Sequence, residues 1–171
     1  MYRCSNRSLF TFFLAVQFVV TSVAEGFAQG HSLDVAASKM KVAPGFEVEL
    51  FAGEPLVRQP VSIEFDDRGR MWVMQYLQYP NPAGLKRVKV DRYSRTVYDR
   101  VPEPPPKGPR GADKLTILED SDGDGRIDQA KDFVDGLNLA TGMAFGHGGV
   151  FVLNVPYLLF YPDRNRDDVP D

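Results

Sequence analysis

Residues 120–128 carry aspartates in the pattern Asp-x-Asp-x-Asp-Gly-x-x-Asp. Calcium is a hard cation that binds six to eight oxygen atoms, and carboxylates at alternate positions of a tight loop can converge on one ion. The predicted ligands are the carboxylates of Asp120, Asp122, Asp124 and Asp128 and the backbone carbonyl of Arg126. The twelfth position is Lys131 instead of the EF-hand glutamate, and a strand precedes the loop where an EF-hand has a helix. The sequence predicts a calcium-binding loop, with a solvated acidic turn as the alternative.

A second aspartate-rich segment begins at Asp163, 43 residues after Asp120. Oxygen-bearing side chains stand at its first, third, fifth and ninth positions, which are Asp163, Asn165, Asp167 and Asp171. Asp168 replaces Gly125 at the sixth position, where a glycine suits a sharp turn. We predict a second calcium site here, with a poorer set of ligands.

Two further side chains are candidates for catalysis. His147 lies in a Gly-His-Gly-Gly stretch, and an imidazole can act as a catalytic base or a metal ligand. The alternative is a turn histidine without a chemical role. Gln75 is a candidate pocket residue by its position alone. The chain contains one cysteine, Cys4, which excludes an intrachain disulfide, a four-cysteine zinc site and a C-x-x-C-H haem attachment.

The segments that flank these residues alternate apolar and polar side chains, which predicts β-strands. Such runs are 46–50, 61–65 and 70–76, and the last two form a hairpin around a turn at 66–69. We expect Trp72 to be a core residue of its strand. The same phrase recurs 80 residues later, so that Phe145 matches Phe65 and Gly149 matches Gly69.

A repeat of about forty residues with several short strands is typical of propeller blades. The 80-residue spacing then equals one blade plus an insertion at about 77–112, which holds 7 of the 13 prolines. Residues 43–171 are therefore expected to form an all-β, partial propeller. Because propellers need 4–8 blades and this chain has material for about two, we expect the N-terminal part of a larger protein. The alternative is a complete small β-sandwich.

Residues 1–28 read as a secretory signal peptide. Arg3 and Arg7 precede an apolar run at 9–20, which is shorter than the ~20 residues of a membrane span. Cleavage is expected after Ala24 or Ala28, followed by a polar lead-in at 29–42, export to the periplasm or cell surface, and no membrane span in the mature chain. The alternative is an uncleaved membrane anchor.

The insertion is strongly basic. Residues 86–110 hold eight Lys or Arg and three acids, whereas 113–135 hold eight acids and three bases. One interpretation is a surface for an anionic ligand or partner, with Tyr76, Tyr79, Tyr93 and Tyr98 as stacking groups. The favoured one is an ordered loop whose charges pair with the acidic segment. The net charge of −3 argues against nucleic acid as a partner. Residues 102–106 are expected to be polyproline II.

Several phrases together resemble one family: APGFEVELFAGEPLVRQPVSIEFDDRGRMWV, LEDSDGDGRID, FVDGLNLATGM and GHGGVFV. They are similar to the start of the large secreted membrane-bound dehydrogenases of planctomycete-type bacteria, which resemble glucose/sorbosone dehydrogenases. The resemblance implies a six-bladed propeller and, in some relatives, pyrroloquinoline quinone and calcium. It also implies helical repeats and a haem-bearing cytochrome c segment in a further C-terminal region.

From this resemblance we expect the N-terminal part of an exported, quinone-dependent sugar or aldehyde dehydrogenase. Its partners would be the other blades or C-terminal domains of a longer protein and a sugar-like small molecule, and this chain alone would be inactive. The histidine base of such enzymes has no certain match in His147. The alternative function is a calcium-binding propeller scaffold or binding module without catalysis.

Overall fold

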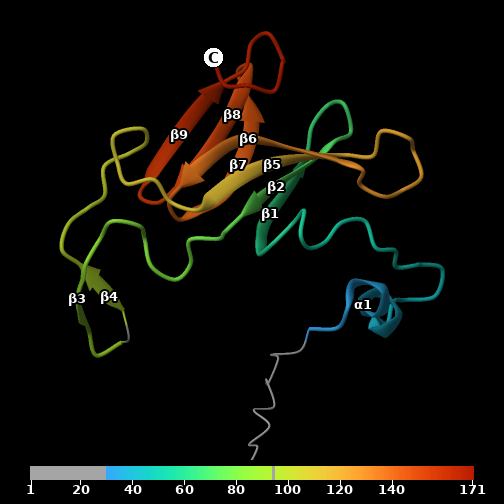
Figure 1. Ribbon diagram of the computed structural model, residues 1–171, viewed down its shortest axis with the longest axis horizontal. Coiled ribbons are helices and arrows are strands. Elements are labelled where there is room, and N and C mark those ends of the chain that lie inside the picture. The colour runs from blue at the N-terminus through green and yellow to red at the C-terminus, as the bar shows by residue number, and fades with distance from the viewer. Residues whose placement is uncertain (1–29, 94) are drawn as a thin grey trace, which may run out of the picture. The chain divides into compact units, whose positions relative to one another are not determined.

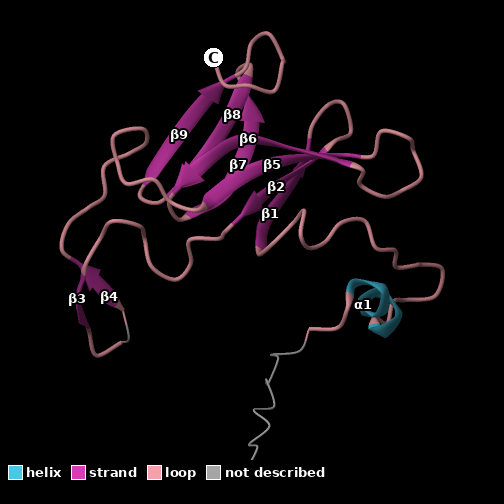
Figure 2. Cartoon of the chain, in the orientation of Figure 1, coloured by secondary structure: helices cyan, strands magenta, loops and turns pink. Residues whose placement is uncertain are grey.

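The computed structural model describes residues 30–93 and 95–171, which consist mainly of strands and loops (Figure 1). Helix α1 spans Leu33–Lys39. The strands are β1 (Pro60–Phe65), β2 (Met71–Gln75), β3 (Arg87–Val90), β4 (Thr96–Tyr98), β5 (Asp113–Glu119), β6 (Gln129–Leu137), β7 (Ala140–Gly146), β8 (Gly149–Asn154) and β9 (Tyr157–Pro162). The predicted all-β class is confirmed (Figure 2). The predicted signal peptide and Cys4 lie outside the described residues.

Two antiparallel sheets form the body of the fold. The first has the strand order β1-β2-β5-β6, and the second has the order β7-β8-β9. The predicted insertion lies between β2 and β5 and contributes the separate β3–β4 hairpin. Without the insertion, both sheets are simple meanders in which consecutive strands pair. By this order β1, β2 and β5 of the first sheet correspond to β7, β8 and β9 of the second.

The two predicted hairpins are present at the predicted 80-residue spacing. Phe65 ends β1 beside a turn in which Gly69 has a φ of 78°. The β7–β8 turn places His147 at a φ of 53° and Gly148 at 70°. Left-handed conformations of this kind favour glycine, which explains the glycines of both turns. His147 adopts one with a full side chain.

A single apolar core is shared by the two sheets. Its buried members are Trp72, Met74, Leu115, Ile117, Phe133, Leu137, Ala140, Val150 and Val152. The predicted core role of Trp72 is confirmed, because its ring centroid lies 4.9 Å from that of Phe133 in β6 and 5.1 Å from that of Phe145 in β7. One indole thus packs against a strand of each sheet, and such aromatic contacts add to the energy of burial.

Buried polar side chains tie the connecting segments to the sheets. The carboxylate of Asp113, at the start of β5, accepts the backbone N–H of Gln78 at 2.5 Å and of Ala140 at 2.8 Å. Asn154 accepts the N–H of Asn138 at 2.7 Å. Burial raises the pKa of Asp113, although hydrogen bonds from backbone N–H groups oppose this effect. Every buried polar side-chain atom found in the described residues has a hydrogen-bond partner.

The predicted strand at 46–50 is wrong. This segment has no regular structure, and Phe46 is 74% exposed. Alternation permits a strand, but a strand needs a paired edge. Among the described residues, the backbone hydrogen bonds at the two ends of this run join Phe46 N–H to the carbonyl of Ala43 at 3.1 Å and Ile127 N–H to that of Phe51 at 3.2 Å, and they form no ladder. The β1 strand is confirmed, yet its apolar residues Val61, Ile63 and Phe65 are exposed rather than buried.

Two other expectations about irregular segments need correction. The lead-in contains helix α1, which was not predicted. The polyproline II expectation for 102–106 is wrong at its end, since the N–H groups of Lys107 and Gly108 both donate to the carbonyl of Pro104 and form a turn. No helix in the described part of the chain combines the length and apolar character required to cross a membrane.

The favoured interpretation of the basic insertion is also wrong. Of its eight Lys and Arg residues, only Arg110 forms an ion pair with the acidic segment, to Asp135 at 2.5 Å, among the residues described. Arg95 and Arg100 pair instead with Asp91 and Asp99 inside the insertion. Neighbouring charge blocks in the sequence therefore do not neutralise each other in the fold.

Candidate metal centre and the two aspartate loops

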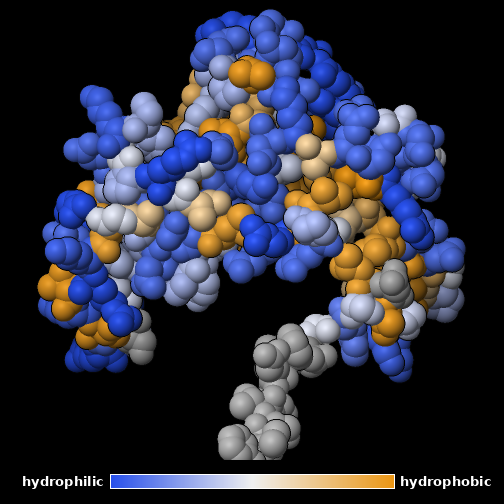
Figure 3. Space-filling view, viewed as in Figure 1, coloured by the Kyte–Doolittle hydropathy of each residue, from blue (hydrophilic) through white to orange (hydrophobic). Residues whose placement is uncertain are grey.

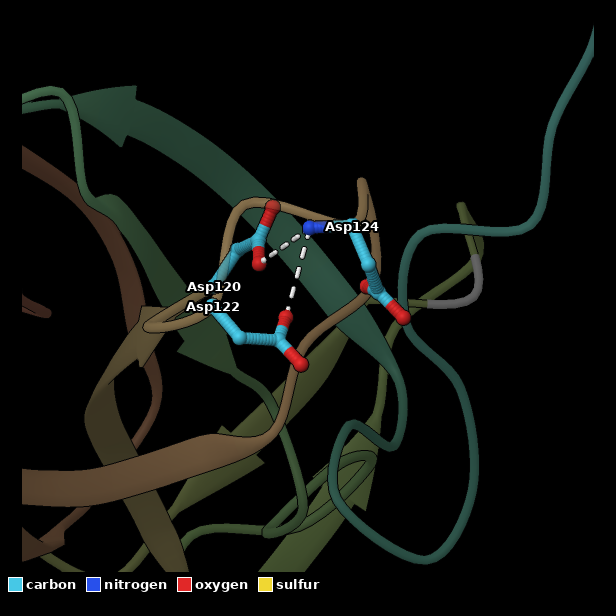
Figure 4. A group of neighbouring side chains, drawn as sticks. All are labelled: Asp120, Asp122 and Asp124. Atoms are coloured by element: carbon cyan, nitrogen blue, oxygen red, sulfur yellow. Dashed lines mark hydrogen bonds between the residues drawn. The ribbon is translucent and has the colours of Figure 1, made fainter.

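The first aspartate loop connects β5 to β6 at one end of the first sheet (Figure 4). Asp120, Asp122 and Asp124 each offer a carboxylate oxygen, and these oxygens lie within 4.8 Å of one another. Asp122 and Asp124 are exposed and Asp120 is half-buried. Three negative charges at this spacing repel each other unless a cation or water screens them. The structure thus brings together three of the four predicted carboxylate ligands.

Hydrogen bonds within the loop hold these carboxylates in place. Asp120 accepts the N–H groups of Gly123 at 2.7 Å and Asp124 at 3.1 Å with one oxygen and that of Gly125 at 2.8 Å with the other. Asp122 and Asp124 each use only Oδ1 in such bonds. Their Oδ2 atoms accept no hydrogen bond among the residues described here. Those two oxygens are therefore available for a cation.

Asp128, the fourth predicted carboxylate, serves the loop in a different way. It accepts the backbone N–H of Ser121 at 3.0 Å and the hydroxyl of Ser121 at 2.5 Å. The hydroxyl bond is the largest cause of the lowered pKa of Asp128. Arg126, whose carbonyl was a predicted ligand, donates its N–H to Asp124 at 2.8 Å. Asp128 closes the loop on its first turn and is not part of the three-carboxylate group.

The second aspartate loop, 163–171, follows β9 and repeats the first in backbone detail. In both loops, the first side chain accepts the N–H groups of the fifth and sixth residues, and the third accepts that of the fifth. The fifth accepts the N–H of the seventh, and the ninth that of the second. The fourth and sixth residues have positive φ in both loops. They are Gly123 and Gly125 in the first loop and Arg166 and Asp168 in the second.

Cations of the protein itself surround the second loop. Both guanidinium ends of Arg70 bond to Asp168 at 2.8 Å, and the Nε of Arg70 bonds to Asp66 at 2.9 Å. Lys131 donates to the carbonyl of Asp167 at 2.8 Å, and Arg166 bonds to Asp67. The second loop is thus fixed to the β1–β2 turn of the first sheet, and Asp167 Oδ2 is already taken by Asn165 at 2.9 Å.

The ion pairs of Arg70 with Asp66 and Asp168, here named the Arg70 clamp, shift the pKa values of all three groups. The hydrogen bond from Arg70 is the main cause that lowers the pKa of Asp168. Burial disfavours the charged form of Asp66, but hydrogen bonds from Trp72, Arg70 and Arg68 outweigh it and lower the pKa of Asp66. The bond to Asp168 in turn raises the pKa of Arg70. All three groups are therefore ionised in the folded protein at neutral pH.

His147 faces a pocket of about 450 Å³ next to the clamp. The β1–β2 turn, the β7–β8 turn and the second loop line this pocket, which includes Arg70, Trp72 and Phe145. The exposed imidazole forms no hydrogen bond with the part of the chain that the structure describes, and its ring stands edge-on to that of Phe151, with 6.2 Å between the ring centroids. No carboxylate of the described residues is hydrogen-bonded to the imidazole, so the arrangement offers a binding surface more than a catalytic pair.

Gln75 lies away from this pocket and is buried at the end of β2. Its Oε1 accepts the N–H of Arg58 at 2.8 Å, and its Nε2 donates to Thr116 at 2.8 Å and to the carbonyl of Leu56 at 3.3 Å. These bonds fasten the segment before β1 to the first sheet. The structure therefore gives Gln75 a structural role, and Gln75 is not among the residues that line the pocket of His147.

Two features of the site carry no local signal in the sequence. The Arg70 clamp joins residues 98 positions apart. Glu49, in the segment wrongly predicted as a strand, places a carboxylate oxygen 4.0 Å from the point where a side chain on Gly125 would begin. Glu49 is therefore a fourth carboxylate close to the loop that holds Asp120, Asp122 and Asp124. Only the folded chain reveals either relation, because sequence spacing reports contacts within one element.

A model of the DUF7133 family, described as a domain of unknown function, matches residues 32–171. The match covers most of the chain, which therefore belongs to this family. No curated protein and no solved structure matches the chain.

Proposed function

We propose that this member of the DUF7133 family is a propeller-type β module that binds one calcium ion at the loop 120–128. The observation that carries the proposal is the convergence of Asp120, Asp122 and Asp124, whose carboxylate oxygens lie within 4.8 Å of one another. Their ligand type is the one that calcium prefers, and the ion would relieve the repulsion among the three charges.

The arrangement of donors supports calcium rather than a softer metal. All nearby ligand atoms are oxygens, and the loop has no histidine or cysteine, which zinc and copper prefer. Hydrogen bonds from backbone N–H groups orient the carboxylates in advance. The Glu49 carboxylate beside Gly125 supplies a further oxygen close to the loop, and water can complete a flexible shell of six to eight ligands.

The second loop is excluded from this proposal, although the sequence predicts a site there. Asn165 stands where the first loop has Asp122, and two predicted ligands already accept hydrogen bonds: Asp167 Oδ2 from Asn165 at 2.9 Å and Asp171 Oδ2 from Arg164 at 3.3 Å. A calcium ion here would also be repelled by the guanidinium of Arg70, which bonds to Asp168 at 2.8 Å, and by the ammonium of Lys131, which bonds to the backbone carbonyl of Asp167 at 2.8 Å. We therefore assign one ion per chain.

The propeller part of the proposal rests on the two sheets. The first three strands follow the same order in both sheets, the two hairpins are 80 residues apart, and the loop that follows the third strand has the same conformation in each. Repeated meanders of this kind are what successive blades look like. Because a propeller needs more than two blades, the proposal includes sister blades that lie outside residues 30–171.

An oxidoreductase role rests on the family resemblance alone. The residues around His147 do not suit a polyanionic quinone, since Asp66, Asp67 and Asp168 share that pocket and occupy its arginines. We propose instead that this module is a scaffold, exported as the N-terminal sequence indicates, and that any dehydrogenase chemistry belongs to other parts of a longer protein.

Calorimetric titration of calcium into the chain tests the proposal. We expect one ion per chain, and about tenfold weaker binding for Asp122→Asn, which removes a charge but keeps the hydrogen bond that Asn165 makes in the second loop. The matched control is Asp167→Asn in the second loop, which should bind as the wild type does. An absence of heat at millimolar calcium, or an equal loss in both variants, would refute the site.

A further inference from the structure

The β3–β4 hairpin is exposed on both faces. No residue of β3 is buried, and Val88 and Tyr93 are each 62% exposed. The two strands pair only with each other, so each has an open edge with unpaired backbone N–H and C=O groups. Figure 3 shows hydrophilic side chains, interrupted by hydrophobic ones, over this hairpin. It contributes nothing to the shared core.

Most positive charges of the hairpin region have no acidic partner. Of the eight Lys and Arg residues at 86–110, five have no carboxylate within 4.0 Å among the described residues: Lys86, Arg87, Lys89, Arg92 and Lys107. All five are exposed. Three of them stand at positions 86, 87 and 89, on or next to β3. The hairpin region therefore carries a group of exposed cations that pair with no carboxylate of the described residues.

We propose that this hairpin is a docking surface for an anionic polysaccharide, a chain of sugars that carry carboxylate or sulfate groups. An extended strand advances about 3.3 Å per residue, so its cations form a line that matches a linear polyanion. Arginine binds carboxylate and sulfate-like groups through two parallel hydrogen bonds. The exposed rings of Tyr79 and Tyr93 can pack against sugar rings, and Arg92 already stacks on Tyr93 at 4.6 Å.

The open edges favour a polysaccharide over a lipid bilayer. Unpaired backbone groups are costly in a hydrocarbon phase, whereas sugar hydroxyls satisfy them. The exposed Val88 and Val90 stand two residues apart and share one face of β3, whereas the charged Lys89 between them lies on the other face. Nucleic acid is also a polyanion, so the binding experiment includes duplex DNA as a competing ligand.

Binding of the full chain to immobilised heparin and to polygalacturonate tests the proposal. The buffer contains a chelator, so that no ion at the loop 120–128 can bridge the polysaccharide and failure of the calcium proposal leaves this test intact. We expect the double variant Arg87→Gln/Lys89→Gln to bind about tenfold more weakly at low salt. The slope of log Kd against log salt should fall by about two, one for each lost contact.

The matched control is Lys39→Gln/Lys41→Gln, which removes the same charge from exposed positions outside the hairpin. It should bind as the wild type does, and the fluorescence of the sole tryptophan, Trp72, should show an intact core in both variants. The proposal is overturned if neither polysaccharide binds, if both double variants lose affinity equally, or if anionic vesicles or duplex DNA bind as tightly at the same salt concentration.

Discussion

The two aspartate loops have the same backbone and opposite surroundings. Each bonds its first side chain to the N–H groups of its fifth and sixth residues, and each closes through its ninth residue. In the loop 120–128 (Figure 4), Asp122 and Asp124 are exposed, and the Oδ2 atom of each accepts no hydrogen bond from the described residues. In the loop 163–171, Arg70 holds the side chain of the sixth residue instead.

This difference shows that the hydrogen-bond pattern of the loop defines a shape and not a ligand. Carboxylates that cap backbone N–H groups are sufficient to fold the loop in both places. What the loop binds depends on the side chains at its third and sixth positions and on the cations near it. The open loop 120–128 can hold a metal ion. The loop 163–171 instead connects the two sheets through the bonds of Arg70 to Asp66 and Asp168, and we call this connection the joint.

Removal of Arg70 should break the joint and leave the open loop intact. In Arg70→Met, Asp66 and Asp168 lose their shared cation while both carboxylates stay mostly buried. Loss of one partner of a buried ion pair costs about 3–5 kcal/mol, so we expect the free energy of unfolding to fall by about 3 kcal/mol in urea denaturation. Calcium affinity at the loop 120–128 should not change.

The control for this prediction is Arg95→Met, which breaks an exposed pair with Asp91 inside the insertion. Exposed pairs contribute about 0–1 kcal/mol, so this variant should unfold close to the wild type. If Arg70→Met is as stable as Arg95→Met, the clamp does not join the sheets, and the second loop is merely a solvated turn.

Acid should weaken the joint through the same carboxylates. Because the pKa values of Asp66 and Asp168 are lowered in the folded protein, their stabilising effect is complete above the ordinary aspartate pKa of about 3.9. It is lost as the pH falls through the lowered values. Asp168→Asn should cost about 2 kcal/mol at pH 7, as expected for a hydrogen bond to a charged group.

Urea midpoints of the wild type and of Asp168→Asn, measured from pH 7 to pH 2, check this prediction. The difference between wild type and Asp168→Asn should shrink as the pH falls, because the wild-type carboxylate becomes neutral. Asp113 acts in the opposite sense, since its raised pKa favours protonation in the folded state and offsets part of the acid loss. A difference that stays constant across the range would contradict the role of the Asp168 charge.

Much of the fold could be predicted because its signals are local. The alternation in 61–65 and 70–76, the glycines of both hairpin turns and the 80-residue echo identified β1, β2, β7 and β8. The same alternation misled at 46–50, where pairing depends on an available sheet edge that a one-dimensional pattern cannot report. Helix α1 was missed because a seven-residue helix is too short for a clear periodic signal.

The candidate site divides along the same line. The aspartates at 120, 122 and 124 were predicted because their spacing lies within one loop. The Arg70 clamp and the approach of Glu49 to Gly125 were not, since each joins segments far apart in the chain. The asymmetry between the loops is therefore a property of tertiary structure, and the sequence showed only a replaced glycine at Asp168.

The smallest expected effect comes from the fourth position of each loop, where both backbones have positive φ. Gly123 has a φ of 76° and no neighbouring atom within 4 Å of an added Cβ, so Gly123→Ala should cost about 1 kcal/mol through backbone strain alone.

Arg166 already bears that strain at a φ of 60°. In Arg166→Gly, relief of the strain offsets the loss of the exposed pair with Asp67, which contributes about 0–1 kcal/mol. Unfolding in urea should therefore show Gly123→Ala destabilised and Arg166→Gly nearly neutral. A clear loss in Arg166→Gly would mean that the joint includes Asp67 as an energetic partner, and the contrast between the loops would then extend beyond Arg70.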